Sequence, residues 1–487
     1  MAVTDEQISR VVGAVPKGLL IGGKWIDTES KVAVENPATG KTLAEVADAS
    51  PAQGIEALDA AVAASAEWAA TDPRVRGEIL RKAFELLTER AEDIALLMTL
   101  EMGKPLAEAR GEVTYGSEFF RWFSEEAVRI AGRYSIAPSG GTRLLTMKQP
   151  VGPVYAITPW NFPLAMGTRK IGPALAAGCT VVIKPAAQTP LTTLALAAVL
   201  IESGLPDGVL NVITTSQSGK VSGPIIADPR LRKLTFTGST SVGQKLIEQS
   251  AQQVLKVSME LGGNAPFVVF GDADLDKAVD GAMLAKMRNI GEACTAANRF
   301  IVHESVAAEF SQRLAERMGA MTIGPGIDDG VTVGPLVDKA AVDKVTELVA
   351  DAVGKGAKVL TGGTAIEGPG HFYPPTVLTG IGTDANVFRE EIFGPVAPVI
   401  TFSTDQQGID LANNTEYGLV AYAFTQDLTR AITVAEKLET GMVGINQGIV
   451  SNPAAPFGGV KASGLGREGG TEGIEEYLET KYVGIKL

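Results

Sequence analysis

The chain has 487 residues, of which 45% are hydrophobic and 20% charged, and it carries a formal net charge of −13. This length predicts two or three globular domains, and the negative charge argues against a nucleic-acid partner. No apolar run is long enough to cross a membrane and the N-terminus has no apolar signal segment, so we expect a cytoplasmic protein without a membrane partner.

Short strands around tight turns are expected over residues 19–48, followed by helical patterns over 51–69, 73–102 and 105–131. Ser50 before Pro51 is typical of a helix start, with a capping side chain and a proline in the first turn. These helices predict a helical layer.

From residue 151 to 252, short apolar strands alternate with helical stretches. This rhythm predicts an open parallel sheet whose ligands bind beyond the carboxyl ends of the strands. A second α/β pattern begins at KVSMEL (256–261), which predicts a domain boundary near residue 258. Residues 134–148 and the tail from 472 onward favour extended edge strands, which often pair between subunits.

Cysteine and histidine are rare, with two of each in the chain. Cys179 and Cys294 are too few for a disulfide framework or a cysteine-based zinc site, and two histidines exclude a histidine-rich metal centre. We therefore expect no metal. If a cysteine is a nucleophile, we expect its base to be a carboxylate.

Three residues have surroundings that suit chemistry, and each also has a plain structural interpretation. Cys294 lies among polar residues in GEACTAANR, whereas Cys179 lies in an apolar run typical of a buried thiol. Glu260 ends a strand before two glycines and faces a cavity or simply solvent. Asn161, between prolines in TPWNFP, suits a rigid amide aimed at an oxyanion or a proline-rich turn.

The segment LTFTGSTSVG predicts a strand, a tight turn at Gly238 and a helix capped by Ser239. The amides at such a helix N-terminus favour a pyrophosphate, although an ordinary capped turn has the same pattern. Two other matches to nucleotide-binding motifs are discounted. GLGREG matches the dinucleotide fingerprint G-x-G-x-x-G but follows no expected strand. GSTSVGQK is similar to a phosphate loop but lacks its Gly-Lys.

Seven motifs occur in an order that resembles the aldehyde dehydrogenase superfamily, from about residue 20 to the C-terminus. They are PWNFP, VVIKPA, FTGSTSVG, MELGGNAP, GEACTAANR, EEIFGPV and PFGGVKASGLGREGG. Asn161 lies 133 residues and Glu260 lies 34 residues before Cys294, as in typical members.

The resemblance implies an α/β fold with two open parallel domains and a small β extension for oligomerisation. It implies a cofactor domain formed by residues 1–128 and 148–258, a catalytic domain at 259–450, and oligomerisation segments at 129–147 and 465–487. It also implies a homodimer or homotetramer.

The resemblance also implies the catalytic roles. Cys294 would be the nucleophile, Asn161 and the Cys294 backbone N–H the oxyanion hole, and Glu260 the general base. The aldehyde would form a thiohemiacetal on Cys294, pass a hydride to a nicotinamide, and leave a thioester for water to hydrolyse.

The implied cofactor is NADP or NAD. Its expected contacts run from Lys184 at the adenosine ribose, through Gly238 and Ser239 at the pyrophosphate, to Glu391 with Phe393 at the nicotinamide ribose, and Trp160 lines the same cleft. Ala187 stands where NAD-preferring members often have a glutamate, and this favours NADP.

Closer similarity to succinate-semialdehyde dehydrogenases runs through residues 160–186, 287–289 and 448–470. In that subfamily Arg169, Arg288 and Ser451 would bind the distal carboxylate, because arginine can hold a carboxylate through two parallel hydrogen bonds. A helix-surface ion pair is the plain alternative for both arginines. Glutarate semialdehyde, one methylene longer, is the second substrate, since one methylene discriminates weakly.

Two departures from the pattern surround the nucleophile. Ala296 stands where some relatives have a second cysteine, so we expect no disulfide in this loop. Glu292 replaces the more usual glutamine, and its carboxylate would raise the thiol pKa if it faced Cys294.

Two other classes of protein are considered. A cysteine esterase or thioesterase would use the same cysteine, but it leaves the cofactor features at Lys184 and Glu391 unexplained. A non-catalytic structural protein leaves the intact set of nucleophile, base and oxyanion amide unexplained.

Overall fold

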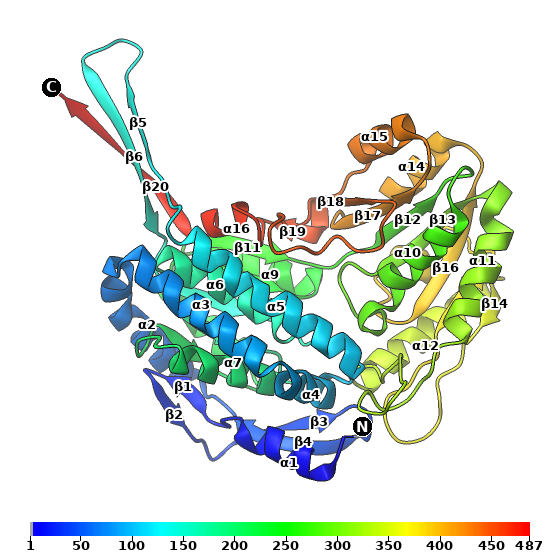
Figure 1. The fold of residues 1–487 in the computed structure, drawn as a ribbon, viewed down its shortest axis with the longest axis horizontal. Coiled ribbons are helices and arrows are strands. Elements are labelled where there is room, and N and C mark those ends of the chain that lie inside the picture. Colours follow the sequence, from blue (N-terminus) through cyan, green and yellow to red (C-terminus); the bar gives the residue numbers. More distant parts are fainter. Residues whose placement is uncertain (1–2) are drawn as a thin grey trace.

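The computed structural model describes residues 3–487 and consists of two α/β units with a β extension that projects from the first (Figure 1). The expected α/β class is confirmed. No helix within residues 3–487 is long and apolar enough to span a membrane.

The first unit is built on an eight-stranded sheet in the order β19-β11-β10-β7-β8-β9-β1-β2. Strands β7 to β11 are parallel, and β1, β2 and β19 run antiparallel at the edges. The strands are β1 (Leu19–Ile21), β2 (Lys24–Ile26), β7 (Val154–Ile157), β8 (Val181–Lys184), β9 (Leu210–Val212), β10 (Lys233–Thr237), β11 (Lys256–Glu260) and β19 (Gly464–Leu465).

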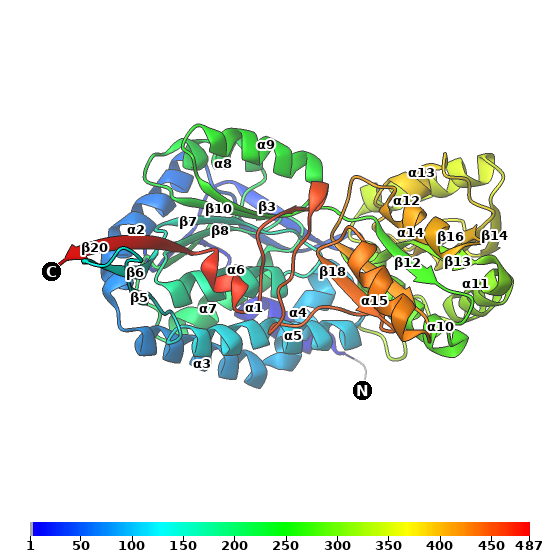
Figure 2. The same cartoon turned by 90° about the horizontal axis from the view of Figure 1, so that it is seen from above.

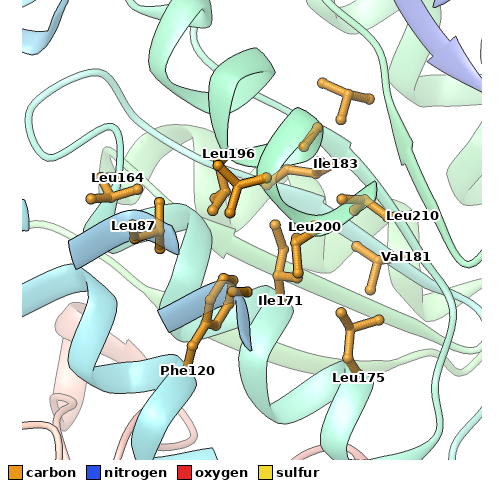
Figure 3. Close-up of a cluster of buried hydrophobic side chains, with 14 of the residues drawn as sticks. Leu87, Phe120, Leu164, Ile171, Leu175, Val181, Ile183, Leu196, Leu200 and Leu210 are labelled. Atoms are coloured by element: carbon orange, nitrogen blue, oxygen red, sulfur yellow. The ribbon is translucent and has the colours of Figure 1, made fainter. Parts of the chain in front are cut away.

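Helices cover both faces of this sheet (Figure 2), so its central strands β7 and β8 are buried at every position, as is usual in a parallel sheet. On one face lie α2 (Pro51–Ala70), α8 (Ser218–Ala227) and α9 (Thr240–Ala251). The other face packs against α3 (Pro73–Glu89), α4 (Ala91–Met102), α5 (Leu106–Glu126), α6 (Ala165–Ala177) and α7 (Pro190–Glu202). Leucine, isoleucine and valine side chains such as Leu87, Ile171 and Val181 fill the second interface (Figure 3).

The helix starts follow the sequence closely. Ser50 caps α2 through the Gln53 backbone N–H, with Pro51 in the first turn, as expected. The single expected helix over 73–102 is two helices divided at Arg90, whose φ of −98° and ψ of 18° leave the helical region. No glycine or proline marks this break, so the sequence pattern could not reveal it.

The remaining elements of this unit complete its periphery. The N-terminal α1 (Asp5–Ala14) packs against α4, and β3 (Lys31–Asn36) pairs with β4 (Lys41–Ala47) as a separate ribbon. The short strands around turns expected over 19–48 are thereby confirmed. Near the C-terminus, α16 (Glu472–Glu475) returns to pack on α6.

The second unit holds a seven-stranded sheet in the order β14-β15-β16-β13-β12-β17-β18. Its strands are β12 (Ala265–Val269), β13 (Ala297–His303), β14 (Lys358–Thr361), β15 (Thr376–Thr379), β16 (Val396–Phe402), β17 (Val420–Phe424) and β18 (Met442–Ile445). Around it lie α10 (Leu275–Met287), η1 (Arg288–Gly291), α11 (Glu304–Gly319), α12 (Lys339–Gly354), α13 (Asn386–Arg389), α14 (Asp405–Asn413), α15 (Leu428–Lys437) and η2 (Lys461–Ser463).

The change from the first sheet to the second falls between β11 and β12. The sequence analysis assigns KVSMEL to the second unit, and the structure corrects this, because β11 pairs with β10 along its whole length, from Lys233 beside Lys256 to Thr237 beside Glu260. A short apolar strand carries no mark of which sheet it joins.

The extension is a three-stranded antiparallel sheet that projects from the first unit (Figure 1). It consists of β5 (Arg133–Ile136), β6 (Thr142–Pro150) and β20 (Leu478–Lys486). The extended segments expected near 134–148 and at the tail are confirmed, and β20 pairs with β6 over nine residues from Leu478 to Lys486.

Candidate active site

A cavity of about 350 Å³ lies between the two units, at the carboxyl ends of β7, β10 and β11. This is where ligands are expected in an open parallel sheet. The structure brings many of the predicted residues together in its lining: Trp160, Asn161, Gly238, Ser239, Glu260, Cys294, Glu391 and Phe393.

Cys294 follows a strained turn at the end of α10. Asn289, Ile290 and Gly291 all have positive φ, at 54°, 61° and 78°. For an isoleucine this conformation is costly, so the surrounding contacts must hold it. The turn directs the Cys294 side chain into the cavity, while Cys179 is fully buried beside the Tyr477 carbonyl.

The electrostatics keep the resting Cys294 thiol protonated. Burial raises the pKa of Cys294 to about 12; the Arg169 and Arg288 charges lower it, and Glu391 and Glu260 raise it further. The charges of the two arginines therefore favour the thiolate that a nucleophile needs.

Asn161 is held rigidly at the end of β7. Its Nδ2 donates to the Glu292 carbonyl at 3.0 Å, and its Oδ1 accepts from the Phe162 backbone N–H at 3.1 Å. An amide nitrogen has two hydrogens, so a second one is left for an oxyanion. The predicted rigidity therefore has a specific cause in these two hydrogen bonds.

A buried ion pair beneath this loop was not identified from the sequence. Lys104 and Glu112 are paired and almost fully buried, and Lys104 donates to the Asn161 carbonyl at 2.8 Å. Glu112 accepts from the backbone N–H groups of Leu164 and Ala165 at the start of α6. The pair thus holds both ends of the loop that carries Asn161.

Glu260 is the last residue of β11 and is buried against the cavity. Neither of its carboxylate oxygens has a hydrogen-bond partner among residues 3–487. Burial raises its pKa well above the ordinary value, and the neighbouring Glu468 raises it further, whereas Arg169 and Lys170 lower it. A carboxyl group of this kind suits proton transfer with a water in the cavity.

Arg169 lies behind the cavity rather than in a surface ion pair. It is 1% exposed, pairs with Glu468, and lies over the Phe457 ring with its guanidinium carbon 4.4 Å from the centroid. Lys170 also pairs with Glu468 and donates to Thr235 at 3.1 Å. Sequence reasoning missed Lys170 and Glu468, which lie 298 residues apart.

The start of α9 fits a phosphate. Ser239 occupies the capping position, but its side chain makes no capping hydrogen bond within the described chain, contrary to the sequence expectation. The first backbone N–H groups of α9 are therefore free to bind an anion. A Cβ on Gly238 would lie 2.5 Å from the Phe236 ring, so the turn requires glycine.

Glu391 and Phe393 line the opposite wall of the cavity. Glu391 Oε1 accepts from the Gly263 N–H at 3.0 Å, which fixes the carboxylate. Phe393 has a positive φ of 55° and meets Trp160 edge to face, with ring centroids 5.3 Å apart. The structure thus places the residues expected at the nicotinamide ribose next to the catalytic residues.

Lys184 is the last residue of β8 and Ala187 follows it, and neither lines the first cavity. Lys184 is buried, and burial lowers its pKa to about 8. Its ammonium donates to the Pro185 carbonyl at 3.2 Å. Ala187 is half-buried and adds no charge to this region, so a second phosphate on the cofactor would meet no carboxylate from residue 187.

A second cavity, of about 900 Å³, begins beside Phe162 and is lined by Tyr115, Arg288 and Ser451. Arg288 Nη1 donates to Ser451 Oγ at 3.3 Å, and the guanidinium lies 4.9 Å from the Phe162 ring centroid. The structure therefore brings together two of the three residues expected at the substrate carboxylate. Arg169, the third, is committed to Glu468.

The family model of the aldehyde dehydrogenase family matches residues 25–483. The chain is 60% identical to a succinate-semialdehyde dehydrogenase of Paenarthrobacter nicotinovorans over 443 residues, which cover 91% of this chain and 98% of that one. It is 50% identical to a glutarate-semialdehyde dehydrogenase of Pseudomonas putida over 489 residues, covering both chains fully. A crystal structure described as an E. coli NADP dependent enzyme superposes with a TM-score of 0.96 at 49% identity, covering 100% of each chain.

A thiol, an amide donor and a carboxyl group thus meet in one cavity on a fold shared with these enzymes, and the chain belongs to the aldehyde dehydrogenase family. The resemblance read from the seven motifs is confirmed, and the chain is an oxidoreductase of that family.

Proposed function

We propose that this protein oxidises succinate semialdehyde to succinate, with NADP as the preferred cofactor and NAD as the second. The position of Arg288 carries the proposal: it is bound to Ser451 and faces the cavity that adjoins Phe162, one residue from Asn161. A cation there would bind the distal carboxylate of a short semialdehyde. The relative named as a succinate-semialdehyde dehydrogenase supports the same substrate.

Cys294 forms the covalent bond in this proposal. Glu260, or a water beside it, takes the thiol proton, and the thiolate attacks the aldehyde carbon and yields a thiohemiacetal whose oxygen carries the developing charge. The free hydrogen of Asn161 Nδ2 and the Cys294 backbone N–H stabilise that oxygen, and one such donor contributes about 3 kcal/mol. The hydrogen bonds from Phe162 and to Glu292 keep the Asn161 amide in place throughout.

The residues of the first cavity fit NADP. The uncapped N-terminus of α9 and the close turn at Gly238 would hold the pyrophosphate, Glu391 and Phe393 the nicotinamide ribose, and Lys184 the adenosine ribose. When bound, the nicotinamide would take up the hydride of the thiohemiacetal carbon and leave a thioester on Cys294. The uncharged Ala187 allows a 2′-phosphate, in line with the NADP dependent enzyme of similar fold.

Glu260 completes the cycle. Glu260 lines the cavity, and its buried carboxyl oxygens are free of partners within residues 3–487, so they are available to accept a proton from a water beside the thioester. Glu260 takes a proton as that water attacks, the C–S bond breaks, and the proton then passes from Glu260 to the Cys294 thiolate. The acid product then leaves through the second cavity.

The experiment is steady-state formation of reduced cofactor from succinate semialdehyde, glutarate semialdehyde and butanal, with NADP and with NAD. We expect both semialdehydes to be preferred, because Arg288 and Ser451 act on the carboxylate alone. Arg288→Ala should raise the KM of the semialdehydes about 10- to 100-fold, the value of a charged hydrogen bond, and leave butanal unchanged.

Three controls sharpen this test. Cys294→Ala should abolish turnover. Arg317→Ala removes an arginine from the same cavity wall, one that already pairs with Asp280 at 2.8 Å, and should have little effect. Arg169→Ala should slow all three aldehydes, because Arg169 lowers the thiol pKa. Butanal turnover equal to that of the semialdehydes would leave only a general aldehyde dehydrogenase.

Glutarate semialdehyde is the second candidate substrate, and the size of the second cavity favours its inclusion. About 900 Å³ holds either semialdehyde, so the extra methylene meets no steric limit. The relative named as a glutarate-semialdehyde dehydrogenase is 50% identical over the full length of both chains.

We further infer a homodimer or homotetramer that works in the cytoplasm and has no nucleic-acid partner. The projecting sheet leaves Tyr134 63%, Ile136 57% and Tyr482 60% exposed, which is unusual for a monomer and typical of a surface covered by another subunit. β5 and most of β6 lie in the segment 129–147 and β20 lies in 465–487, and we assign these segments to oligomerisation. A free catalytic thiol suits the reducing cytoplasm.

A further inference from the structure

Glu292 is fully buried between Cys294 and the turn that precedes it, and its backbone and side chain contact different parts of the site. Its carbonyl accepts from Asn161 Nδ2 at 3.0 Å and from Asn289 Nδ2 at 2.9 Å. Its backbone N–H donates to the Asn289 carbonyl at 2.8 Å. The main chain of Glu292 therefore holds both the oxyanion amide and the strained turn.

The side chain of Glu292 turns away from the thiol. Its Oε1 accepts from the Val337 backbone N–H at 3.1 Å. Val337 and Asp338 line the same cavity as Cys294, and Asp338 caps α12 through the Ala341 N–H. One carboxyl group thus connects the nucleophile's turn to the cavity wall formed at the start of α12.

The surroundings of this carboxyl disfavour a charge on it. Its Oε2 has no hydrogen-bond partner in the described part of the chain. The groups that act on it are the Val337 N–H, the Asp338 carboxylate and the Lys104 ammonium, and Lys104 is already committed to Glu112 and the Asn161 carbonyl. Burial raises the pKa of Glu292 well above its ordinary value, and Asp338 raises it further.

We propose that Glu292 is a positioning residue that works as an uncharged carboxylic acid, joining the Cys294 turn and Asn161 to the 337–338 wall of the cofactor cavity, and that its ionisation at alkaline pH sets a second carboxylate against Asp338 and displaces this wall. The inference rests on the proposed use of that cavity for NADP. It predicts that an uncharged acceptor is required at position 292, and that an acid is not.

Two substitutions separate these requirements. Glu292→Gln keeps an oxygen acceptor for the Val337 N–H and cannot ionise. Glu292→Met has a similar length but leaves that N–H without a partner. The measurements are the rate at which iodoacetamide alkylates Cys294, followed by mass spectrometry of its peptide, and the affinity for NADP by fluorescence titration, both without aldehyde. The peptide of the buried Cys179 is the internal control for unfolding.

Near pH 7 we expect the Glu292→Met variant to bind NADP about tenfold more weakly than the wild type. We expect iodoacetamide to alkylate its Cys294 about fivefold faster. Both changes correspond to the loss of one buried hydrogen bond. Glu292→Gln should restore both values. As the pH rises, the wild type should lose NADP affinity and Glu292→Gln should retain it.

The proposal is overturned if Glu292→Met matches the wild type, if Glu292→Gln is as impaired as Glu292→Met, or if the wild type and Glu292→Gln lose NADP affinity in parallel. Failure of the proposed function is a separate result. In that case the wild type would oxidise none of the semialdehydes while the alkylation rates still followed the substitutions at Glu292.

Discussion

Buried charged side chains surround the catalytic cavity, and most of them have an opposite charge beside them. Lys104 pairs with Glu112, and Arg169 and Lys170 share Glu468. Lys286 in α10 differs: it is fully buried, and its ammonium has no hydrogen-bond partner among residues 3–487. Burial lowers the pKa of Lys286 to about 7, and the charge of Glu391 acts against this shift.

Lys286→Met should stabilise the protein in a pH-dependent way. Below about pH 7 the folded chain carries a buried ammonium that the unfolded chain keeps in water, so the free energy of unfolding is lowest there. Between about pH 7 and the ordinary lysine pKa of 10.5, the unfolded state binds more protons and stability rises with pH. The gain from Lys286→Met should therefore be largest below about pH 7 and shrink above it.

Urea unfolding of the wild type and Lys286→Met across this pH range checks the prediction. Lys277→Met is the matched control, since Lys277 lies in the same helix with its side chain 74% exposed, and it should change stability little at any pH. A stability gain for Lys286→Met that does not vary with pH would show that Lys286 is not the group that titrates.

At the scale of single residues, the sequence predicted the site residues that lie in short recognisable motifs and missed the site residues that lie in none. Cys294, Glu260 and Asn161 lie in short motifs, and the structure places all three in one cavity. Lys104 contacts the Asn161 carbonyl 57 residues further along the chain, and Glu468 pairs with Lys170, 298 residues before it. No periodicity or spacing links such pairs.

At the scale of elements, the position of Glu260, the proposed base, depends on a very short strand. In β19, Gly464 pairs with Glu260 and Leu465 pairs with Met259, which closes the edge of the first sheet beside Glu260. GLGREG resembles a dinucleotide motif by chance, and the structure shows that Gly464 and Leu465 in it form this edge strand. A strand of two residues has no detectable alternation, so it could not be predicted.

Gly464→Ala should displace β19 and lower activity. Gly464 has a φ of +121°, and a Cβ there would lie 1.8 Å from the Met259 carbonyl oxygen, a contact that only backbone movement can relieve. We expect a loss of about 2–4 kcal/mol in the free energy of unfolding and a lower kcat, because Glu260 moves with Met259.

Gly111→Ala is the opposite case and serves as the control. Gly111 lies inside α5 and an added Cβ would meet nothing within 4 Å, so alanine should stabilise the helix by about 0.5–1 kcal/mol. Circular dichroism melts and kcat of both variants give the comparison. An unchanged kcat in Gly464→Ala would show that β19 does not position the base.

At the scale of the whole molecule, the alternation of short apolar strands and helices predicted both sheets, and extended segments outside that alternation predicted the extension. This pattern could not predict how the chain returns: after β18 of the second unit it runs back to the first, contributing β19, α16 and β20 (Figure 1). Residues that close the site therefore come last in the sequence.

The double substitution Ile136→Asp and Tyr482→Asp should shift the protein to smaller species, because it places charges on exposed apolar positions of the projecting sheet. Sedimentation velocity measures the outcome. Asp substitutions at Lys148 and Lys256, polar residues near the base of the same sheet, are the control. An unchanged sedimentation coefficient in the double variant would place the subunit interface elsewhere.

The late return of the chain also determines when the protein becomes active during its synthesis. Both sheets and the nucleophile's turn are encoded before residue 446, but the edge strand beside Glu260 and the Glu468 carboxylate come after residue 460. A polypeptide that ends in that region would contain Cys294 and Glu260 but lack the strand that pairs with Glu260 and the carboxylate that pairs with Arg169 and Lys170. Truncation there therefore leaves both side chains in the chain without the contacts that surround Glu260.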